Sequence, residues 1–459
     1  MNHHVVCLGC IRSKWEPPAR LDGVRAAIRL TKFAAFAFLG WLAVSAQASV
    51  NIEHWVAASG ARVYFVESRG LPIVDIQVDF AAGSAYDPEE KKGVAGFTRG
   101  LMEAGAGGMD EETLAGKLVD TGARMSGSTD LDRSGFSLRT LSSRVERDAS
   151  LEIMRAVLQD PAFPAEVLER ERGRAIAGIR EGDTRPDTIA AKRFSAAVFP
   201  NHPYGYSATV ESVSRVTRDD LVAFHRAHYS AQRSVVSIIG DVSRDEAEAI
   251  AQRLTEGLPK GAATALLPEQ VLPKREMVRV DHPAAQSHVF LGMPGMRRGD
   301  PDFFPLLVGN YILGGGGFVS RLTKEVREKR GFAYSVYSYF QPLQQPGPFQ
   351  IGLQTKREQA TEALRVVQAT LEEFLKNGPA EEEVRSAKQN LVDGFVLRLD
   401  SNRKILDHIA MIGFYGLPLD YLDEYPRQVA KVTAAQIRDA FARRIKPEHL
   451  VTVIVGGSS

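Results

Sequence analysis

Arg327 and Tyr334 have side chains suited to binding a carbonyl oxygen, and they stand seven residues apart. A guanidinium offers a fork of N–H donors, and a phenol offers one O–H. The sequence predicts a helix that Ser320 caps and Gly331 ends, followed by a strand that begins near Tyr334. We therefore expect the two side chains to meet across Gly331. The alternative interpretation is a basic helix on the surface with no binding role.

Four consecutive glycines, Gly314, Gly315, Gly316 and Gly317, precede this helix. Glycine tolerates positive φ and leaves backbone that a ligand can approach closely. These four positions are therefore candidate substrate-binding residues together with Arg327 and Tyr334. A mobile loop is the alternative. The run is not a phosphate-binding loop, because no Gly-Lys-Ser/Thr closes it.

The composition is that of an ordinary globular protein. The chain has 459 residues, of which 44% are hydrophobic and 25% are charged, so it is long enough for two or three domains. A net charge of +1 gives no indication of nucleic-acid binding.

The N-terminus resembles a secretory signal. Basic residues precede the apolar run 33–44, and Ala46-Gln47-Ala48 fits a small-x-small cleavage site. We expect a signal peptide over 1–48, a mature chain beginning at Ser49, and a periplasmic location. The run is too short to span a bilayer, so no stable membrane anchor is expected. Both cysteines, Cys7 and Cys10, precede the cleavage site, which leaves the mature chain without a disulfide.

An internal repeat organises the rest of the chain. Residues 216–240 align with residues 432–456 without a gap, at an offset of 216. Each copy reads as a Thr cap, a helix, a short turn, an apolar strand and a glycine. Strands are predicted at 62–66, 73–80, 126–130, 134–141, 234–240, 287–293, 333–340 and 348–354, and helices at 94–104, 111–121, 145–158, 164–181, 185–198, 217–228, 243–254, 303–313, 357–376 and 380–398. We expect two homologous α+β domains, 49–257 and 274–459, joined by a linker over 258–273, each a mainly antiparallel sheet backed by helices.

Two stretches give the chain a family resemblance. Gly83-Ser84, Pro88 and Gly93-Val94-Ala95 resemble the residues that lead into the inverted zinc motif of the pitrilysin, insulysin and mitochondrial processing peptidase family. The repeat, the length and the stretch from Ser320-Arg321-Leu322 to Tyr334-Ser335 resemble the same family. The resemblance covers nearly all of the expected mature chain.

The resemblance implies a metal site that this chain lacks. Active members carry H-x-x-E-H directly after the lead-in, with two His as zinc ligands and the Glu as general base. Here Gly96 and Gly100 replace the two His, and Arg99 replaces the Glu. The third ligand, a Glu, should fall near Gly178. No metal and no catalytic residue is expected in this chain. His225 and His228 do not form a substitute site, and we interpret them as residues that favour a helix C-terminus.

In the family, an Arg and a Tyr with the spacing of Arg327 and Tyr334 bind the substrate backbone, and short-chain members pair two chains into a clamshell. The resemblance thus implies a non-catalytic, substrate-binding subunit of a heterodimeric zinc peptidase that degrades peptides or unfolded segments. A homologous partner would supply the zinc, and this chain would be inactive alone. The alternatives are a non-enzymatic scaffold and a homodimer that only binds peptides.

Overall fold

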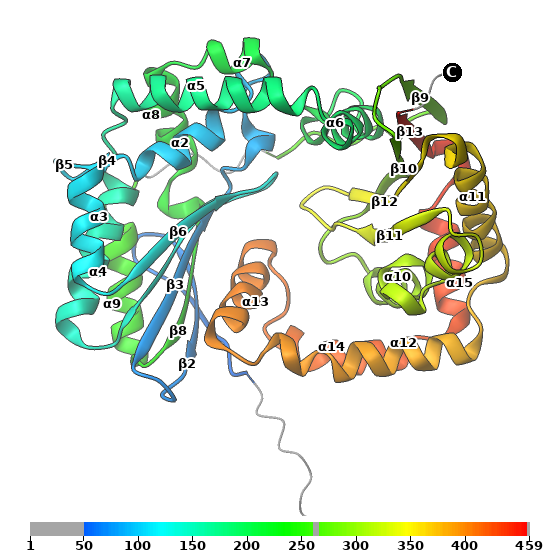
Figure 1. Ribbon diagram of the computed structural model, residues 1–459. Coiled ribbons are helices and arrows are strands. Elements are labelled where there is room, and N and C mark those ends of the chain that lie inside the picture. Colours follow the sequence, from blue (N-terminus) through cyan, green and yellow to red (C-terminus); the bar gives the residue numbers. More distant parts are fainter. Residues whose placement is uncertain (1–49, 260–265, 457–459) are drawn as a thin grey trace, which may run out of the picture. The chain divides into compact units, whose positions relative to one another are not determined.

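The computed structural model describes residues 50–259 and 266–456. The expected signal peptide lies outside these residues. The described chain contains two large mixed sheets, one in each half, and each sheet carries helices (Figure 1). The prediction of two similar α+β halves is therefore confirmed. None of the described helices is both long and apolar enough to cross a membrane.

The first sheet has the strand order β1-β2-β8-β3-β7-β6. Its strands are β1 (Glu53–Val56), β2 (Arg62–Glu67), β3 (Ile73–Phe80), β6 (Arg124–Thr129), β7 (Ser134–Leu141) and β8 (Ser234–Gly240). The pair β2 and β8 is parallel, and the other pairs are antiparallel. Every residue of β8 is buried, because helices cover both faces of the sheet at its centre. A separate two-stranded ribbon joins β4 (Gly105–Ala106) to β5 (Met109–Asp110).

The second sheet has the order β11-β12-β10-β13-β9. Its strands are β9 (Glu276–Val280), β10 (Gln286–Met296), β11 (Ala333–Phe340), β12 (Gly347–Lys356) and β13 (Val451–Val455). Only β13 and β9 run parallel to each other among the pairs of this sheet. The two sheets therefore share a design in which one parallel pair interrupts an antiparallel sheet.

The helices follow the predicted order closely. The first half contains α2 (Val94–Met102), α3 (Glu111–Asp120), α4 (Arg144–Gln159), α5 (Ala165–Gly182), α6 (Pro186–Val198), α7 (Val210–Ser214), α8 (Arg218–His228) and α9 (Arg244–Thr255). The second half contains α10 (Phe303–Asn310), α11 (Ala360–Asn377), α12 (Glu381–Asp393), α13 (Asn402–Tyr415), α14 (Tyr421–Lys431) and α15 (Ala434–Arg444). The helices α13 and α14 were not among the predicted elements.

The repeat extends to details of the backbone. Thr217 and Thr433 both cap their helices through a reciprocal capping box. The glycine that closes each copy has positive φ, +152° at Gly240 and +99° at Gly456. A Cβ at either position would lie within 3 Å of a backbone oxygen at the start of the neighbouring strand, that of Ile73 or of Gln286. Both glycines are thus required by the same close approach of two strands, as duplication predicts.

The two halves exchange one helix each. Helix α6 of the first half packs on β10 and β13, where Phe194 meets Phe290 with 5.7 Å between ring centroids. Helix α13 of the second half packs on β8, β3 and β2. Gly413 permits this contact, because a Cβ there would lie 2.7 Å from atoms of Tyr64 and Val235. Each sheet is therefore covered on one face by a helix from the other half.

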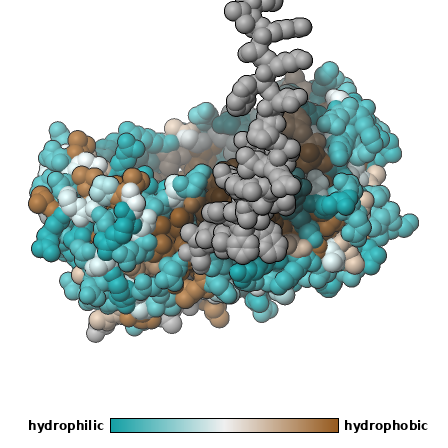
Figure 2. Space-filling model, turned by 90° about the horizontal axis from the view of Figure 1, so that it is seen from below, coloured by the Kyte–Doolittle hydropathy of each residue, from teal (hydrophilic) through white to brown (hydrophobic). Residues whose placement is uncertain are grey.

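On the face shown in Figure 2, hydrophobic residues gather between two more hydrophilic ends.

The glycine run and the helix after it differ from the prediction. The run begins inside a π-helix, η5 (Tyr311–Gly315), and the next segment is also a π-helix, η7 (Thr323–Glu328). Within the glycine run only Gly317 has positive φ, at +60°. Ser320 and Gly331 behave as expected, since the Ser320 hydroxyl accepts from the N–H of Thr323 at 3.4 Å and Gly331 ends the segment with φ +64°. Single-turn π segments often occur at functional sites.

Candidate functional site

Helix α2 starts where the lead-in to the zinc motif ends. Gly93 adopts φ +111° as its N-cap residue, and the Asp87 carboxylate accepts from the backbone N–H groups of Gly93 at 2.8 Å and Ala95 at 2.7 Å. Burial raises the pKa of Asp87 to about 6, although the two N–H groups stabilise the carboxylate and so act to lower that pKa. The lead-in thus retains the local structure that positions a helix, although the helix carries no metal ligand.

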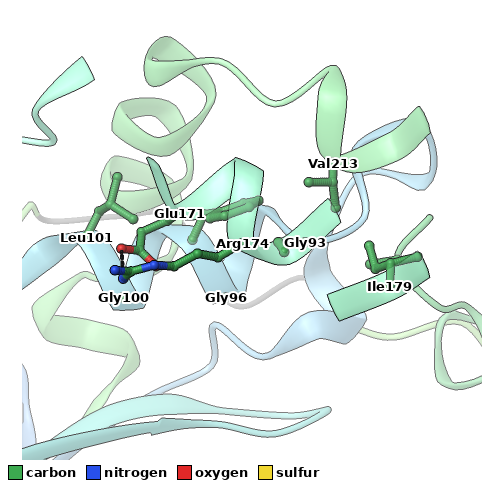
Figure 3. A pocket seen from close by; sticks show the side chains of 11 residues that line it. Gly93, Gly96, Gly100, Leu101, Glu171, Arg174, Ile179 and Val213 are labelled. Carbon is green, nitrogen blue, oxygen red and sulfur yellow. Dashed lines mark hydrogen bonds and ion pairs between the residues drawn. The ribbon is translucent and has the colours of Figure 1, made fainter. Parts of the chain in front are cut away.

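A cavity of about 580 Å³ lies between α2 and α5 (Figure 3). Gly96 and Gly100 line it from α2, so the two positions where the family resemblance led us to expect His face this space. Its wall is mainly apolar, formed by Phe97, Leu101, Ala175, Ile179, Ala208 and Val213. A Cβ built at Gly96, Gly100 or Gly178 would meet nothing within 4 Å. Packing therefore does not require glycine at these positions, since a Cβ has open space there.

The charged groups at this cavity are Glu171 and Arg174 of α5. Their side chains form an ion pair of 2.8 Å, and Arg170 contacts the same Glu171 carboxylate at 2.9 Å. The sequence analysis missed these residues, although their spacing of three places both on one helix face. Gly178, the position expected for a third ligand, lies on α5 but is not among the residues that line the cavity.

These residues do not fit a zinc ion. Zinc in such sites takes three or four ligands from His, Cys, Asp or Glu. The cavity offers one carboxylate, which two arginines already neutralise. Across 50–259 and 266–456, no cluster of three or more such side chains is placed to hold a metal.

Arg99 does not face the position that the resemblance gives it. Its guanidinium pairs with Glu103 at 2.8 Å and lies over the ring of Phe136, 5.1 Å from the centroid. A Cβ at Gly127 would lie 2.1 Å from the guanidinium, so glycine on β6 leaves room for this side chain. Arg99 stands at the position of the expected Glu, but its guanidinium contacts β6 and β7 and is not among the groups that line the cavity. Its charge is neutralised on the sheet side of α2.

His225 and His228 do not act as the charged residues at a helix C-terminus that the sequence suggested. The His225 ring contacts the carbonyl oxygen of Leu158 at 2.9 Å, and the His228 ring contacts that of Ala81 at 3.2 Å. Burial lowers the pKa of both rings, that of His228 to about 4. Both are therefore neutral at pH 7 and contribute as hydrogen-bonded core residues, not as cations at a helix terminus.

Arg327 and Tyr334 meet as the sequence predicts. The Arg327 guanidinium lies over the Tyr334 ring at 5.0 Å and over the Phe318 ring at 4.7 Å. Both rings are exposed, Tyr334 by 85% and Phe318 by 67%. Arg327 forms no ion pair with any acid that the structure describes. A guanidinium held by its faces keeps its N–H edge available, so this cluster can donate hydrogen bonds to a ligand.

The glycines before this cluster have two different roles. Gly314 is buried, and a Cβ there would lie 2.5 Å from the Ser338 backbone nitrogen and 2.8 Å from Leu322. Its glycine serves close packing, so the expectation of ligand-accessible backbone is wrong at Gly314. Gly317 is exposed, and its positive φ leads the chain into Phe318. Phe318 was missed by the sequence analysis, although an aromatic residue directly after the glycine run was a visible signal.

The fold defines a class of α+β proteins built from two similar domains, each with a mixed sheet and helices. A family model described as insulinase, peptidase family M16, matches residues 62–210, and one described as peptidase M16 inactive domain matches residues 215–391. The chain belongs to the M16 peptidase family.

Similar proteins include both peptidase-like and non-peptidase descriptions. A solved structure from Pseudomonas fluorescens, described as a peptidase M16 inactive domain, is 36% identical with a TM-score of 0.86, and the match covers 89% of this chain and 98% of that one. An uncharacterized zinc protease of Mycobacterium bovis is 30% identical over 67% of this chain and 71% of its own length. A Helicobacter pylori protein described as a non-peptidase homolog is 24% identical over 89% of this chain and 95% of its own length.

Proposed function

We propose that this chain is the non-catalytic, substrate-binding subunit of a heterodimeric zinc peptidase that acts on peptides or unfolded segments. One contrast carries the proposal. The Arg327–Tyr334 cluster is assembled, whereas the cavity that Gly96 and Gly100 line in the other half offers no set of metal ligands among the described residues. The zinc would come from a homologous partner chain, and the two chains would close as a clamshell around the substrate.

In this proposal Arg327 and Tyr334 act on a carbonyl oxygen of the substrate. The guanidinium of Arg327 lies against the rings of Phe318 and Tyr334, so in this proposal its N–H groups and the Tyr334 hydroxyl donate to the same ligand. Donors that are already oriented stabilise charge as it develops on that oxygen, and a single such donor typically contributes about 10²–10³ in rate. Among the described residues no set of side chains is placed to hold a metal that would activate water, so the chain alone should be inert towards peptides.

The experiment is reconstitution with the homologous zinc-bearing subunit. Tyr334→Phe removes one hydroxyl from an exposed ring, so folding and assembly should survive. We expect kcat/KM of the reconstituted pair to fall by about 10²–10³. Tyr337→Phe on the same strand is the matched control and should leave the rate within about twofold. An unchanged rate with Tyr334→Phe would favour the non-enzymatic alternatives.

A non-enzymatic scaffold, or a homodimer that only binds peptides, is the second candidate. The description of the Helicobacter pylori relative as a non-peptidase homolog favours it. No partner subunit restores peptidase activity in this case, and the Arg327–Tyr334 cluster would serve binding alone.

Export to the periplasm is part of the proposal. It rests on the apolar run 33–44 and the Ala46-Gln47-Ala48 site. Mass spectrometry of the native protein should find a mature N-terminus at Ser49, and an intact chain in the cytoplasm would contradict it.

A further inference from the structure

Four arginines from both halves of the chain line one cavity of about 360 Å³. Arg62 comes from β2 and Arg233 from the turn before β8, whereas Arg297 and Arg298 come from the turn after β10. Tyr415 of α13 and Gln344 also line this cavity. It is separate from the apolar cavity beside α2 and shares no lining residue with it.

The lining of the arginine cavity is positively charged. No Asp or Glu lines it. Arg62, Arg297 and Arg298 make no ion pair with any acid in 50–259 or 266–456, and Arg233 has its guanidinium 3.1 Å from the ring of His228. Four positive charges thus surround one space. Like charges 4 Å apart repel by about 1 kcal/mol per pair in water, and by more where water is excluded.

Asp132 is the acid close to this cavity, and its carboxylate is already engaged. It accepts from the Tyr415 hydroxyl at 2.9 Å, from the Tyr204 hydroxyl at 2.5 Å and from the N–H of Gln344 at 2.8 Å. Three donors occupy its two oxygens. Asp132 therefore orients Tyr415 but does not line the cavity.

The backbone holds two of the arginines in place. The N–H of Asp300 donates to the carbonyl oxygen of Arg297, and Gly299 takes φ +71° within this turn. The N–H of Arg298 donates to the carbonyl oxygen of Leu343 at 2.8 Å, so the turn is tied to the loop between β11 and β12. The Arg298 guanidinium then lies 5.4 Å from the centroid of the Tyr415 ring.

The Arg298 side chain keeps a hydrogen-bond donor that no described residue uses. Its Nε is buried and has no hydrogen-bond partner among the described residues, which is costly for a charged donor. Burial also lowers the pKa of Arg298, as it does that of Arg233. Arg62 donates one N–H to the carbonyl oxygen of Gly413 at 3.0 Å, which fixes its side chain against α13 and leaves further donors.

We propose that this arginine cavity binds a small, multiply charged oxyanion of the phosphate or diphosphate class. The guanidinium fork matches phosphate oxygens in a bidentate geometry, and several arginines together prefer a ligand with more than one negative charge. The volume falls in the range of small-molecule pockets, which selects a compact ligand over a nucleic-acid strand. Since the arginines come from both halves, the bound anion would tie the halves together.

The test is calorimetric titration of the full mature chain with inorganic pyrophosphate at low ionic strength. We expect saturable binding that weakens as salt is added. Arg298→Gln and Arg62→Gln should each weaken binding by at least about tenfold, because each removes a charge-assisted donor. Arg365→Gln is the matched control, since Arg365 is exposed and pairs with Glu362, and its affinity should equal that of the wild type.

Each outcome decides the proposal. A parallel titration with inorganic phosphate distinguishes a site for one phosphate group from a site for two. Saturable binding of either ligand, with weaker affinity in the Arg298→Gln and Arg62→Gln variants, supports the proposal. Binding absent up to about 1 mM of both ligands, or equal in the Arg62→Gln and Arg365→Gln variants, would overturn it. Arg62→Gln keeps the test decisive if Arg298→Gln fails to fold.

Discussion

The buried carboxylate of Asp132 should be one of the most costly side chains to remove. It is fully buried and accepts hydrogen bonds from Tyr204 of the first half and from Tyr415 and Gln344 of the second. Asp132→Ala would remove the acceptor of three donors, of which that of Tyr204 is buried and those of Tyr415 and Gln344 are partly buried. A hydrogen bond to a charged group contributes about 1.5–3 kcal/mol, and the three are not additive because they share one carboxylate.

Burial of Asp132 opposes part of this stabilisation, and it raises the pKa of the carboxyl. We therefore expect Asp132→Ala to lower the free energy of unfolding by about 3–5 kcal/mol, the usual cost of breaking a buried charged network. Asp132→Asn keeps one acceptor oxygen, and its amide can donate to one tyrosine hydroxyl, so its cost should be about 1 kcal/mol.

Equilibrium urea unfolding measures both values. Asp183→Ala is the control, because Asp183 is 54% exposed and pairs only with Lys192 among the described residues; it should cost less than about 0.5 kcal/mol. The reasoning would be refuted if Asp132→Ala were as stable as Asp183→Ala, or if Asp132→Asn were as destabilised as Asp132→Ala.

Three further predictions concern packing, pH and metal. Gly314→Ala should lower the free energy of unfolding by about 1–3 kcal/mol, because its Cβ would overlap Ser338 and Leu322. Gly116→Ala in α3, where nothing lies within 4 Å of the added Cβ, should raise the free energy of unfolding by about 0.4–1 kcal/mol. Thermal and urea unfolding of both variants measure this difference. Burial lowers the pKa of His228 to about 4 in the folded chain, so the unfolded chain binds the proton more tightly. The free energy of unfolding should therefore fall as the pH drops from about 6.5 to about 4, by up to about 3 kcal/mol from this ring. His228→Gln should flatten that part of the profile of unfolding free energy against pH. Elemental analysis of the purified chain should find less than one zinc per chain, and one tightly held zinc would contradict the description of the degenerate site.

Much of the fold follows from local patterns. The strand 333–340 alternates in sequence, and the Thr217 and Thr433 caps mark their helices directly, so these elements appear where predicted. The meeting of Arg327 and Tyr334 was predictable because a glycine and a short turn separate them. The position of α13 is also contained in the repeat, because the offset of 216 carries the expected helix 185–198 onto 401–414.

Other features depend on contacts that sequence patterns do not encode. The direction of the Arg99 side chain is decided by Glu103 on the same helix and by the space above Gly127 on β6. Gly127 is far from Arg99 in sequence and lies beside it only in the folded chain. The π-helical form of 311–315 places Gly314 against Ser338, a residue of a strand further along the chain. The arginine cavity joins four residues that are far apart in sequence, so no spacing rule reveals it.

Because α6 and α13 each pack on the sheet of the other half, each half needs the other in order to fold. A chain cut within the segment 258–273 would leave each fragment with its partner's helix but without the helix that covers its own sheet. Neither fragment should therefore persist alone as a folded monomer, because each would expose an apolar sheet face. Mixed together, the fragments should reassemble without a covalent link, each inserting its helix into the other. A protease that cleaves this connection would then leave the protein intact in shape, and the cut would become visible only under denaturing conditions.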